Sequence, residues 1–276
     1  LFKYDPRITH YITFPLKRKK KLSTYWKIVR ELRKENGELG VIFVNTFISA
    51  LLFRLGNVKK NIGYNREGRG FLLDFSPEIN YHKHYINRYA FLFNEYIGNK
   101  YVYLPELSLR YTGQKTFQFD NSHKTIALYL GGENKEFRKY PDEYAVQLLR
   151  LLNRQGYNLL LIGDENDNIK HTQYAEEARI DHLINLTART TIEGFINTIA
   201  NVDLIITIDS SALHIAAAVK TPFIALMGLS TSPTSTILPK VPLGRILKIE
   251  NNLIREEDYI RNITPDLILK TISELI

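Results

Sequence analysis

The chain has 276 residues, of which 44% are hydrophobic and 24% charged, a composition that excludes disordered, collagen-like and coiled-coil proteins. It has no cysteine, which excludes disulfides, thiolate zinc sites, iron–sulfur clusters and cysteine nucleophiles. Lys and Arg outnumber Asp and Glu by 37 to 29, so the net charge is +8 and anionic partners are favoured. No apolar run reaches the ~20 residues of a membrane helix. At ~150 residues per domain, the length predicts two domains.

A basic block, Lys-Arg-Lys-Lys-Lys, occupies residues 17–21, directly before an amphipathic helix predicted over 23–36. The block is either a solvated run on a loop or a contact for an anionic membrane or glycolipid. Because no DNA- or RNA-reading motif accompanies it, nucleic acid is not expected as a partner.

The first half predicts alternating strands and helices. We expect strands over 11–14 and 40–44, a helix over 47–55 that ends at Gly56, and an aromatic-rich helix over 82–97. The polar stretch 118–124 is interpreted as a linker. The predicted domains are therefore residues 1–121 and 122–276.

The second half has a clearer pattern of continuous apolar strands separated by helices. Strands are expected over 126–130, 158–162, 183–186, 204–208 and 223–227, with helices over 141–155 and 211–219. Thr190 and Glu193 have the spacing of a capping box at the start of a further helix, which follows the strand over 183–186. Such a pattern predicts an α/β fold whose parallel sheet binds ligands beyond the carboxyl ends of its strands.

Four loops follow these strands and favour a phosphate site. They contain Gly131-Gly132, Gly163-Asp164-Glu165, Asp209-Ser210-Ser211, and Gly228 with the polar residues 230–232. Glycine lets the backbone approach a phosphate, and helix N-termini attract it. A single glycine after a strand is usually only a turn residue, but four such loops at one edge predict a nucleotide site.

Several side chains near these loops have two interpretations each. Asp209 or Ser211 caps the following helix or contacts a ligand, and Lys139 is a surface lysine or binds a diphosphate. His214 is a hydrogen-bonded core histidine or offers a ring nitrogen to a phosphate. No metal site is predicted, since His82 and His84 stand alone. The dinucleotide-binding, P-loop and nucleophile-elbow motifs are missing.

The second half resembles glycosyltransferase family 9, the bacterial heptosyltransferases that build the lipopolysaccharide core, and the first half is similar to the heptosyltransferase II type. The segments that carry the resemblance are Gly131-Gly132 with Lys139-Tyr140-Pro141, residues 159–164, residues 185–191, residues 209–218, residues 221–228, residues 45–52, Ile62-Gly63-Tyr64, and Gly68-Arg69 through Leu72-Leu73. The resemblance covers nearly the whole chain.

The resemblance implies a GT-B fold, in which two Rossmann-like domains with parallel sheets face each other across a cleft. Residues 1–121 would hold the acceptor and residues 122–276 the nucleotide sugar. The implied reaction is inverting, metal-independent transfer of a heptose from ADP-heptose to a lipopolysaccharide core or lipid A-type acceptor, without a cofactor. The expected location is the cytoplasm, with the inner membrane face as a further partner surface.

The resemblance also assigns roles to side chains. Lys139 and Asp209 are the expected catalytic residues, and Glu165 would bind ribose hydroxyls. The donor would further contact Gly131, Gly132, Gly163, Thr187, Ser210, Ser211 and His214.

The chain departs from the family pattern at three places. Ala188 and Ser211 stand where the family usually has glycine, and Ser211 adds a Cβ beside the donor phosphates. The family's opening strand, Gly-Asp loop and helix, with its general-base aspartate, is not matched, so we expect the first domain to be incomplete and the chain as given to transfer no sugar. The alternatives are a sugar-nucleotide-binding protein without transferase activity and a scaffold at the membrane face.

Overall fold

The computed structural model describes residues 2–14, 22–103, 106–120, 122–229, 233–249 and 255–276. The chain divides into two compact units. The large unit comprises residues 1–7, 107–234 and 238–276, and the small unit comprises residues 8–106 and 235–237.

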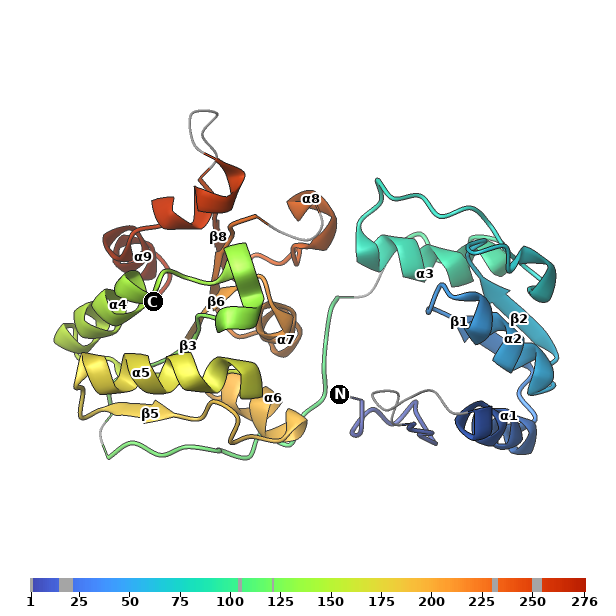
Figure 1. The fold of residues 1–276 in the computed structure, drawn as a ribbon, viewed down its shortest axis with the longest axis horizontal. Helices are drawn as coiled ribbons and strands as arrows, with labels where there is room; N and C mark the ends of the chain where they lie inside the picture. Colours follow the sequence, from blue (N-terminus) through green and yellow to red (C-terminus); the bar gives the residue numbers. More distant parts are fainter. Residues whose placement is uncertain (1, 15–21, 104–105, 121, 230–232, 250–254) are drawn as a thin grey trace. The chain divides into compact units, whose positions relative to one another are not determined.

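The small unit has, among its described residues, a two-stranded parallel sheet in which Leu39 of the first strand pairs with Lys60 of the second (Figure 1). Its elements are α1 (Leu22–Glu35), β1 (Leu39–Ile42), α2 (Phe47–Leu55), β2 (Lys60–Gly63), the 3-10 helix η1 (Gly70–Leu72) and α3 (Tyr85–Tyr96). The predicted helix over 47–55 is confirmed, because the Thr46 side chain accepts the Ser49 N–H at its start and Gly56 follows its end.

In this unit one expected strand is absent, one observed strand was not expected, and the basic block cannot be compared. Residues 11–14 form no strand, and Tyr11 is exposed rather than buried on a sheet face. Strand β2 was not predicted, because its polar start, Lys60-Asn61, gives no apolar alternation. The basic block over residues 17–21 lies outside the described residues.

The large unit has a parallel sheet of six strands among its described residues, in the order β5-β4-β3-β6-β7-β8. The strands are β3 (Thr125–Tyr129), β4 (Asn158–Leu161), β5 (Leu183–Asn185), β6 (Leu204–Ile208), β7 (Phe223–Leu226) and β8 (Gly244–Leu247). The 3-10 helices are η2 (Glu133–Arg138), η3 (Glu165–Asp167) and η4 (Glu256–Asn262), and the α-helices that contain residues of this unit are α4 (Asp142–Arg154), α5 (Asn168–Ala178), α6 (Ile192–Ala200), α7 (Ser211–Val219), α8 (Thr234–Ile237) and α9 (Pro265–Ile272).

Helices cover both faces of the six-stranded sheet. Helix α4 contacts α5 and α9, whereas α6 contacts α7 (Figure 1). Right-handed crossovers place the two sets on opposite faces, because the chain moves outward from β3 in one direction and then returns to β6. Strands β3, β4, β6 and β7 are completely buried, as their continuous apolar sequences predict.

The strand order fixes where this sheet can bind a ligand. The order reverses between β3 and β6, so the loops that leave these two strands diverge to opposite faces. In sheets of this kind, ligands bind beyond the carboxyl ends of the two strands at this point, here β3 and β6. Gly131-Gly132 follows β3, and Asp209-Ser210-Ser211 follows β6.

The boundary between the units falls at residues 106 and 107, whereas the sequence placed it at 121 and 122. Residues 107–120 join the large unit through hydrogen bonds that local sequence does not reveal. The Leu109 N–H donates to the Ala218 carbonyl oxygen at 3.0 Å, and the Asn197 Nδ2 donates to the Thr112 Oγ1 at 2.7 Å. In the described part of the chain, no helix is both long and apolar enough to cross a membrane.

Candidate functional site

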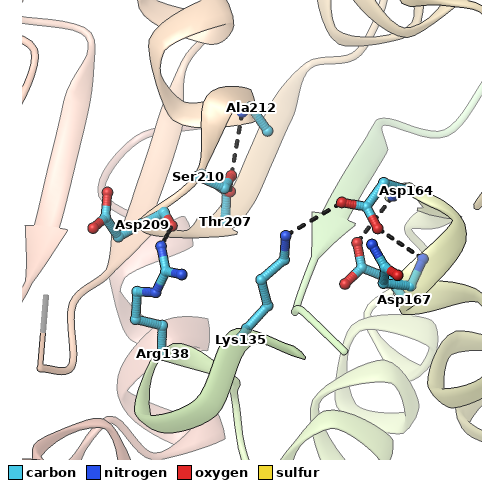
Figure 2. A network of polar contacts seen from close by, with 9 residues as sticks. Lys135, Arg138, Asp164, Asp167, Thr207, Asp209, Ser210 and Ala212 are labelled. Carbon is cyan, nitrogen blue, oxygen red and sulfur yellow. Dashed lines mark hydrogen bonds and ion pairs between the residues drawn. The ribbon is translucent and has the colours of Figure 1, made fainter. Parts of the chain in front are cut away.

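The loops beyond β3, β4 and β6 come together at one edge of the sheet, as Figure 2 shows. The 3-10 helix η2, directly after Gly132, supplies two cations to this edge. The Lys135 Nζ lies 3.3 Å from the Asp164 Oδ2, and the Arg138 Nη1 donates to the Asp209 carbonyl oxygen at 3.5 Å. Arg138 thus connects the segment after β3 to the loop after β6, across the point where the strand order reverses.

The Lys139 side chain pairs with a carboxylate at the start of α4. Its Nζ lies 2.8 Å from the Asp142 Oδ1, and it lines a separate cavity of about 330 Å³ with Pro141 and Arg261. Burial alone would raise the pKa of Asp142, but hydrogen bonds from Lys139, Tyr174 and Lys170 lower it to about 2. Lys139 is therefore paired to a carboxylate that is ionised at neutral pH.

Lys135 and Arg138 were missed by the sequence analysis, although their spacing carried a signal. A 3-10 helix has three residues per turn, so side chains three positions apart project in the same direction. Lys135 and Arg138 have this spacing within η2, and Lys139 follows the last residue of η2. Predicting a helical turn over residues 133–138 would have indicated that Lys135 and Arg138 lie on the same side.

The glycines of the two loops are required by close packing of the backbone. A Cβ on Gly132 would lie 2.6 Å from the Asn166 carbonyl oxygen and 2.7 Å from the Asp167 Cα. A Cβ on Gly163 would lie 2.8 Å from the Asp167 Oδ2, and Gly131 has a φ of +81°. The glycines thus let the loops after β3 and β4 close around Asp167.

A polar network extends from the surface of these loops to buried residues behind them. The Asp164 N–H donates to the buried Asp167 Oδ2 at 2.9 Å, and at the surface the Asp164 Oδ1 accepts the Asn166 N–H at 2.8 Å. His171 is fully buried, with its Nδ1 2.8 Å from the Thr187 Oγ1. Burial lowers the pKa of His171 to about 4, so the ring is neutral at pH 7. The Thr187 hydroxyl, which was expected to contact phosphate, is buried and engaged by His171.

The start of α7 differs from both capping expectations. Ser210 is the N-cap, because its Oγ accepts the Ala212 N–H at 3.2 Å, and neither Asp209 nor Ser211 takes this role. Asp209 is buried, whereas Ser211 is exposed at the first position of the helix. His214 is exposed one turn later, so its interpretation as a core histidine was wrong.

A cavity of about 510 Å³ opens beside these loops, within the size range of small-molecule sites. Its polar wall includes Gly163, Asp164, Glu165 and Ser211, of which Asp164 alone was not among the predicted site residues. Its apolar wall is formed by Ala188, Ile192, Phe195 and Ile215. The cavity can therefore hold a flat apolar group next to hydrogen-bonding partners.

Two features of the cavity rim depart from expectation. Ala188 has a φ of +60°, and its N–H donates to the Gly163 carbonyl oxygen at 3.1 Å. This left-handed conformation favours glycine, so the alanine that this chain has here carries backbone strain. The capping box of Thr190 and Glu193 was wrong, because Thr191 caps α6 while Glu193 accepts hydrogen bonds from Lys3 and Tyr4.

The remaining sequence predictions concern the loop after β7 and metal binding. Residues 230–232, which were expected to complete the loop after β7, lie outside the described residues. Within the part of the chain that is described, no three His, Asp or Glu side chains form a group that could hold a metal ion.

Comparisons with known proteins agree on one family. Residues 25–257 match the family described as glycosyltransferase family 9 (heptosyltransferase). The lipooligosaccharide heptosyltransferase 2 of Haemophilus influenzae is 26% identical over 281 residues, which covers 92% of this chain and 81% of that protein. The enzyme of the same name from Haemophilus ducreyi is 24% identical over 306 residues, with coverages of 98% and 86%.

Solved structures show the same fold. The E. coli ADP-heptose lipopolysaccharide heptosyltransferase II has a TM-score of 0.80 at 21% identity, covering 92% of this chain and 81% of its own. A family 9 glycosyltransferase from Veillonella parvula has a TM-score of 0.84 at 16% identity, with coverages of 99% and 83%. The predicted α/β fold of the GT-B class, with Rossmann-like parallel sheets, is confirmed. The chain belongs to glycosyltransferase family 9 (heptosyltransferase) and is a glycosyltransferase.

Proposed function

We propose that the protein transfers a heptose from ADP-heptose to a lipopolysaccharide core acceptor, with inversion at the anomeric carbon and without a metal ion. Several relatives are named lipopolysaccharide or lipooligosaccharide heptosyltransferases. A structural relative, the E. coli heptosyltransferase WaaC, was solved with ADP and with ADP-2-deoxy-2-fluoro heptose. The observation that carries the proposal is the Arg138 contact with Asp209, which puts a cation beyond the carboxyl ends of β3 and β6.

The adenosine part of the donor fits the 510 Å³ cavity. The adenine ring would lie against Ile192, Phe195 and Ile215, which supply apolar surface. Glu165 lies on the polar wall of the same cavity, and its carboxylate can accept hydrogen bonds from the ribose hydroxyls.

The diphosphate would then lie across the carboxyl ends of β3 and β6. Arg138 and Lys135 supply positive charge there, and the first N–H groups of α7, which begins at Ser211, point toward the same edge. His214, which is exposed one turn into α7, can add a ring nitrogen to these phosphate-binding groups. Asp209 contributes by holding Arg138 through its carbonyl oxygen.

These groups account for the chemistry of the leaving diphosphate. An acceptor hydroxyl attacks the anomeric carbon and loses its proton to a general base, the bond from that carbon to the phosphate oxygen breaks, and negative charge develops on ADP. Cations and N–H groups fixed in place stabilise that charge in the transition state. Arg138 and Lys135 can do so without a metal ion, although Lys135 must divide its charge between the ligand and Asp164.

The membrane partner and the cytoplasmic location belong to the same proposal, because the acceptor is attached to a lipid. The basic residues 17–21, which would carry the membrane contact, lie outside the described residues.

The test is a transfer assay with the full-length protein, ADP-heptose and a heptose-deficient lipopolysaccharide core acceptor. Mass spectrometry should detect one added heptose, NMR should show the inverted anomer, and EDTA should leave the rate unchanged. Absence of a heptosylated product would contradict the proposed function. A retained anomer or an EDTA-sensitive rate would contradict its mechanism.

A further inference from the structure

One carboxylate on the wall of the 510 Å³ cavity opposes the binding of a nucleotide. Asp164 lies on that wall, and its side chain is 49% exposed. Its Oδ1 accepts the Asn166 N–H and so caps the 3-10 helix η3. Asparagine and serine cap helices about as well as aspartate does, so capping requires the oxygen but not the negative charge. A negative charge beside a site for an anion therefore needs another explanation.

The second oxygen of Asp164 holds a cation of the proposed diphosphate site. Its Oδ2 lies 3.3 Å from the Lys135 Nζ, and Figure 2 shows Lys135 reaching from η2 toward Asp164. Among the described residues, Asp164 is the one carboxylate that pairs with Lys135. Asp164 thus takes the same ammonium group that the proposed function assigns to the diphosphate.

Packing holds the Lys135 side chain at this edge of the sheet. The side chain is 19% exposed, and a Cβ on Gly131 would lie 3.1 Å from the Lys135 Cγ, so the lysine stem passes close over the glycine backbone. The Lys135 Nζ lies 5.7 Å from the ring centroid of Tyr129, whose face attracts a cation. The ammonium group therefore stays at the sheet edge, where Asp164 and a bound phosphate would compete for it.

The donor and the product differ in charge at the second phosphate of the nucleotide. In ADP-heptose this phosphate is bonded to the sugar and carries a single negative charge. In ADP it is a terminal phosphate with a second pKa of ~6, so it carries close to two charges at slightly alkaline pH. A nearby lysine attracts ADP more strongly than ADP-heptose, because Coulomb attraction scales with charge. Without a competing anion, Lys135 would retain the product, and product release limits the turnover of many enzymes.

We propose that Asp164 limits the retention of ADP by competing with the product's terminal phosphate for the Lys135 ammonium group. The inference rests on the proposed function, which places the diphosphate beside Lys135. Asp164 is a positioning residue, because it acts on the nucleotide through the lysine. When ADP leaves, the ion pair between Asp164 and Lys135 forms again, as it is in the nucleotide-free structure.

The experiment is a calorimetric titration of the full-length protein at slightly alkaline pH, without acceptor, with ADP, ADP-heptose and adenosine. It compares wild type with Asp164→Asn, whose carboxamide oxygen can still accept the Asn166 N–H but carries no charge. The variant should bind ADP about tenfold more tightly than wild type and ADP-heptose about threefold more tightly. Adenosine, which has no charge, should bind both proteins equally.

Three further variants separate competition for the lysine from other effects. Asp164→Ser, whose hydroxyl can also accept the Asn166 N–H, should tighten ADP binding as Asp164→Asn does. Glu143→Gln is the matched control, because Glu143 is another ion-paired carboxylate of the large unit, 2.9 Å from the Arg261 Nη1 on the wall of the separate 330 Å³ cavity. It should leave ADP binding unchanged. In a Lys135→Gln background, which has no ammonium group to compete for, Asp164→Asn should tighten ADP binding less than it does in wild type.

ADP binding that is unchanged or weaker in both Asp164 variants would overturn the proposal. An equal gain for ADP and adenosine would also overturn it, because the effect would then belong to the cavity rather than to charge. Equal gains for ADP and ADP-heptose would contradict the selective effect on the product. A gain in the Lys135→Gln background as large as in wild type would show direct repulsion instead of competition. No ADP binding to wild type would overturn the proposed function, and this inference with it.

Discussion

Lowering the pH should destabilise the large unit through one histidine. His171 has a pKa of about 4 in the folded protein, because burial disfavours its charged form, against 6.5 when solvated. Between these two pH values the unfolded chain binds a proton that the folded chain does not. Stability is therefore fully present above pH ~6.5 and falls as the pH drops toward about 4.

The size of this loss follows from the difference between the two pKa values. A tenfold change in proton affinity is worth ~1.4 kcal/mol, so the loss attributable to His171 is roughly 3 kcal/mol. The low pKa of Asp142, about 2, adds a further loss only below the pH range in which His171 acts. The two contributions can thus be separated by pH.

Chemical denaturation at pH values from 7 to 4 measures the effect in wild type and in His171→Asn. The asparagine amide can keep the hydrogen bond to Thr187 but cannot take up a proton. The variant should be less stable at pH 7, because the ring leaves a cavity, yet lose roughly 3 kcal/mol less than wild type on acidification. Parallel curves for the two proteins between pH 6.5 and 4 would refute the reasoning.

Three further substitutions test the loops around the site. Ala188→Gly should stabilise the protein by ~0.5–1 kcal/mol in thermal denaturation, since glycine relieves the left-handed backbone at some cost in unfolded-state entropy; a lower melting temperature would contradict this. Gly132→Ala should destabilise it by ~1–3 kcal/mol, because the new Cβ meets backbone atoms at 2.6 and 2.7 Å, and unchanged stability would contradict the packing argument. Ser210→Ala should lower the free energy of unfolding by ~1 kcal/mol, because it removes the N-cap of α7, and Ser211→Ala should lower it less. The reverse order in urea denaturation would identify Ser211 as the N-cap.

The strands and helices of the large unit were predicted well because they depend on local sequence patterns. Strand β6 and helix α7 have the predicted bounds, since continuous apolar runs define them. In the small unit, helix α2 also has its predicted bounds, because Gly56 follows its last residue. The edge of the sheet that gathers the loops after β3, β4 and β6 follows from the same alternation of strands and helices.

The finer features of the site depend on contacts that sequence alone does not reveal. Lys139 precedes Pro141 and seemed placed for a diphosphate, but Asp142 at the start of α4 pairs with it. Arg138, one residue earlier, reaches Asp209 because η2 turns it toward the sheet edge. Thr187 is likewise hidden by the buried ring of His171, which comes from a helix, α5, that the sequence analysis did not identify.

Calorimetric titration of the full-length protein with ADP, in wild type and the variants Arg138→Ala and Lys139→Ala, tests the central claim most directly. The account places the nucleotide diphosphate between β3 and β6, so Arg138→Ala should weaken ADP binding by ~1.5–3 kcal/mol, about 10- to 150-fold. Lys139→Ala should bind ADP like wild type, because Lys139 pairs with Asp142 outside the site. No ADP binding to wild type, or a larger loss in Lys139→Ala than in Arg138→Ala, would contradict the account.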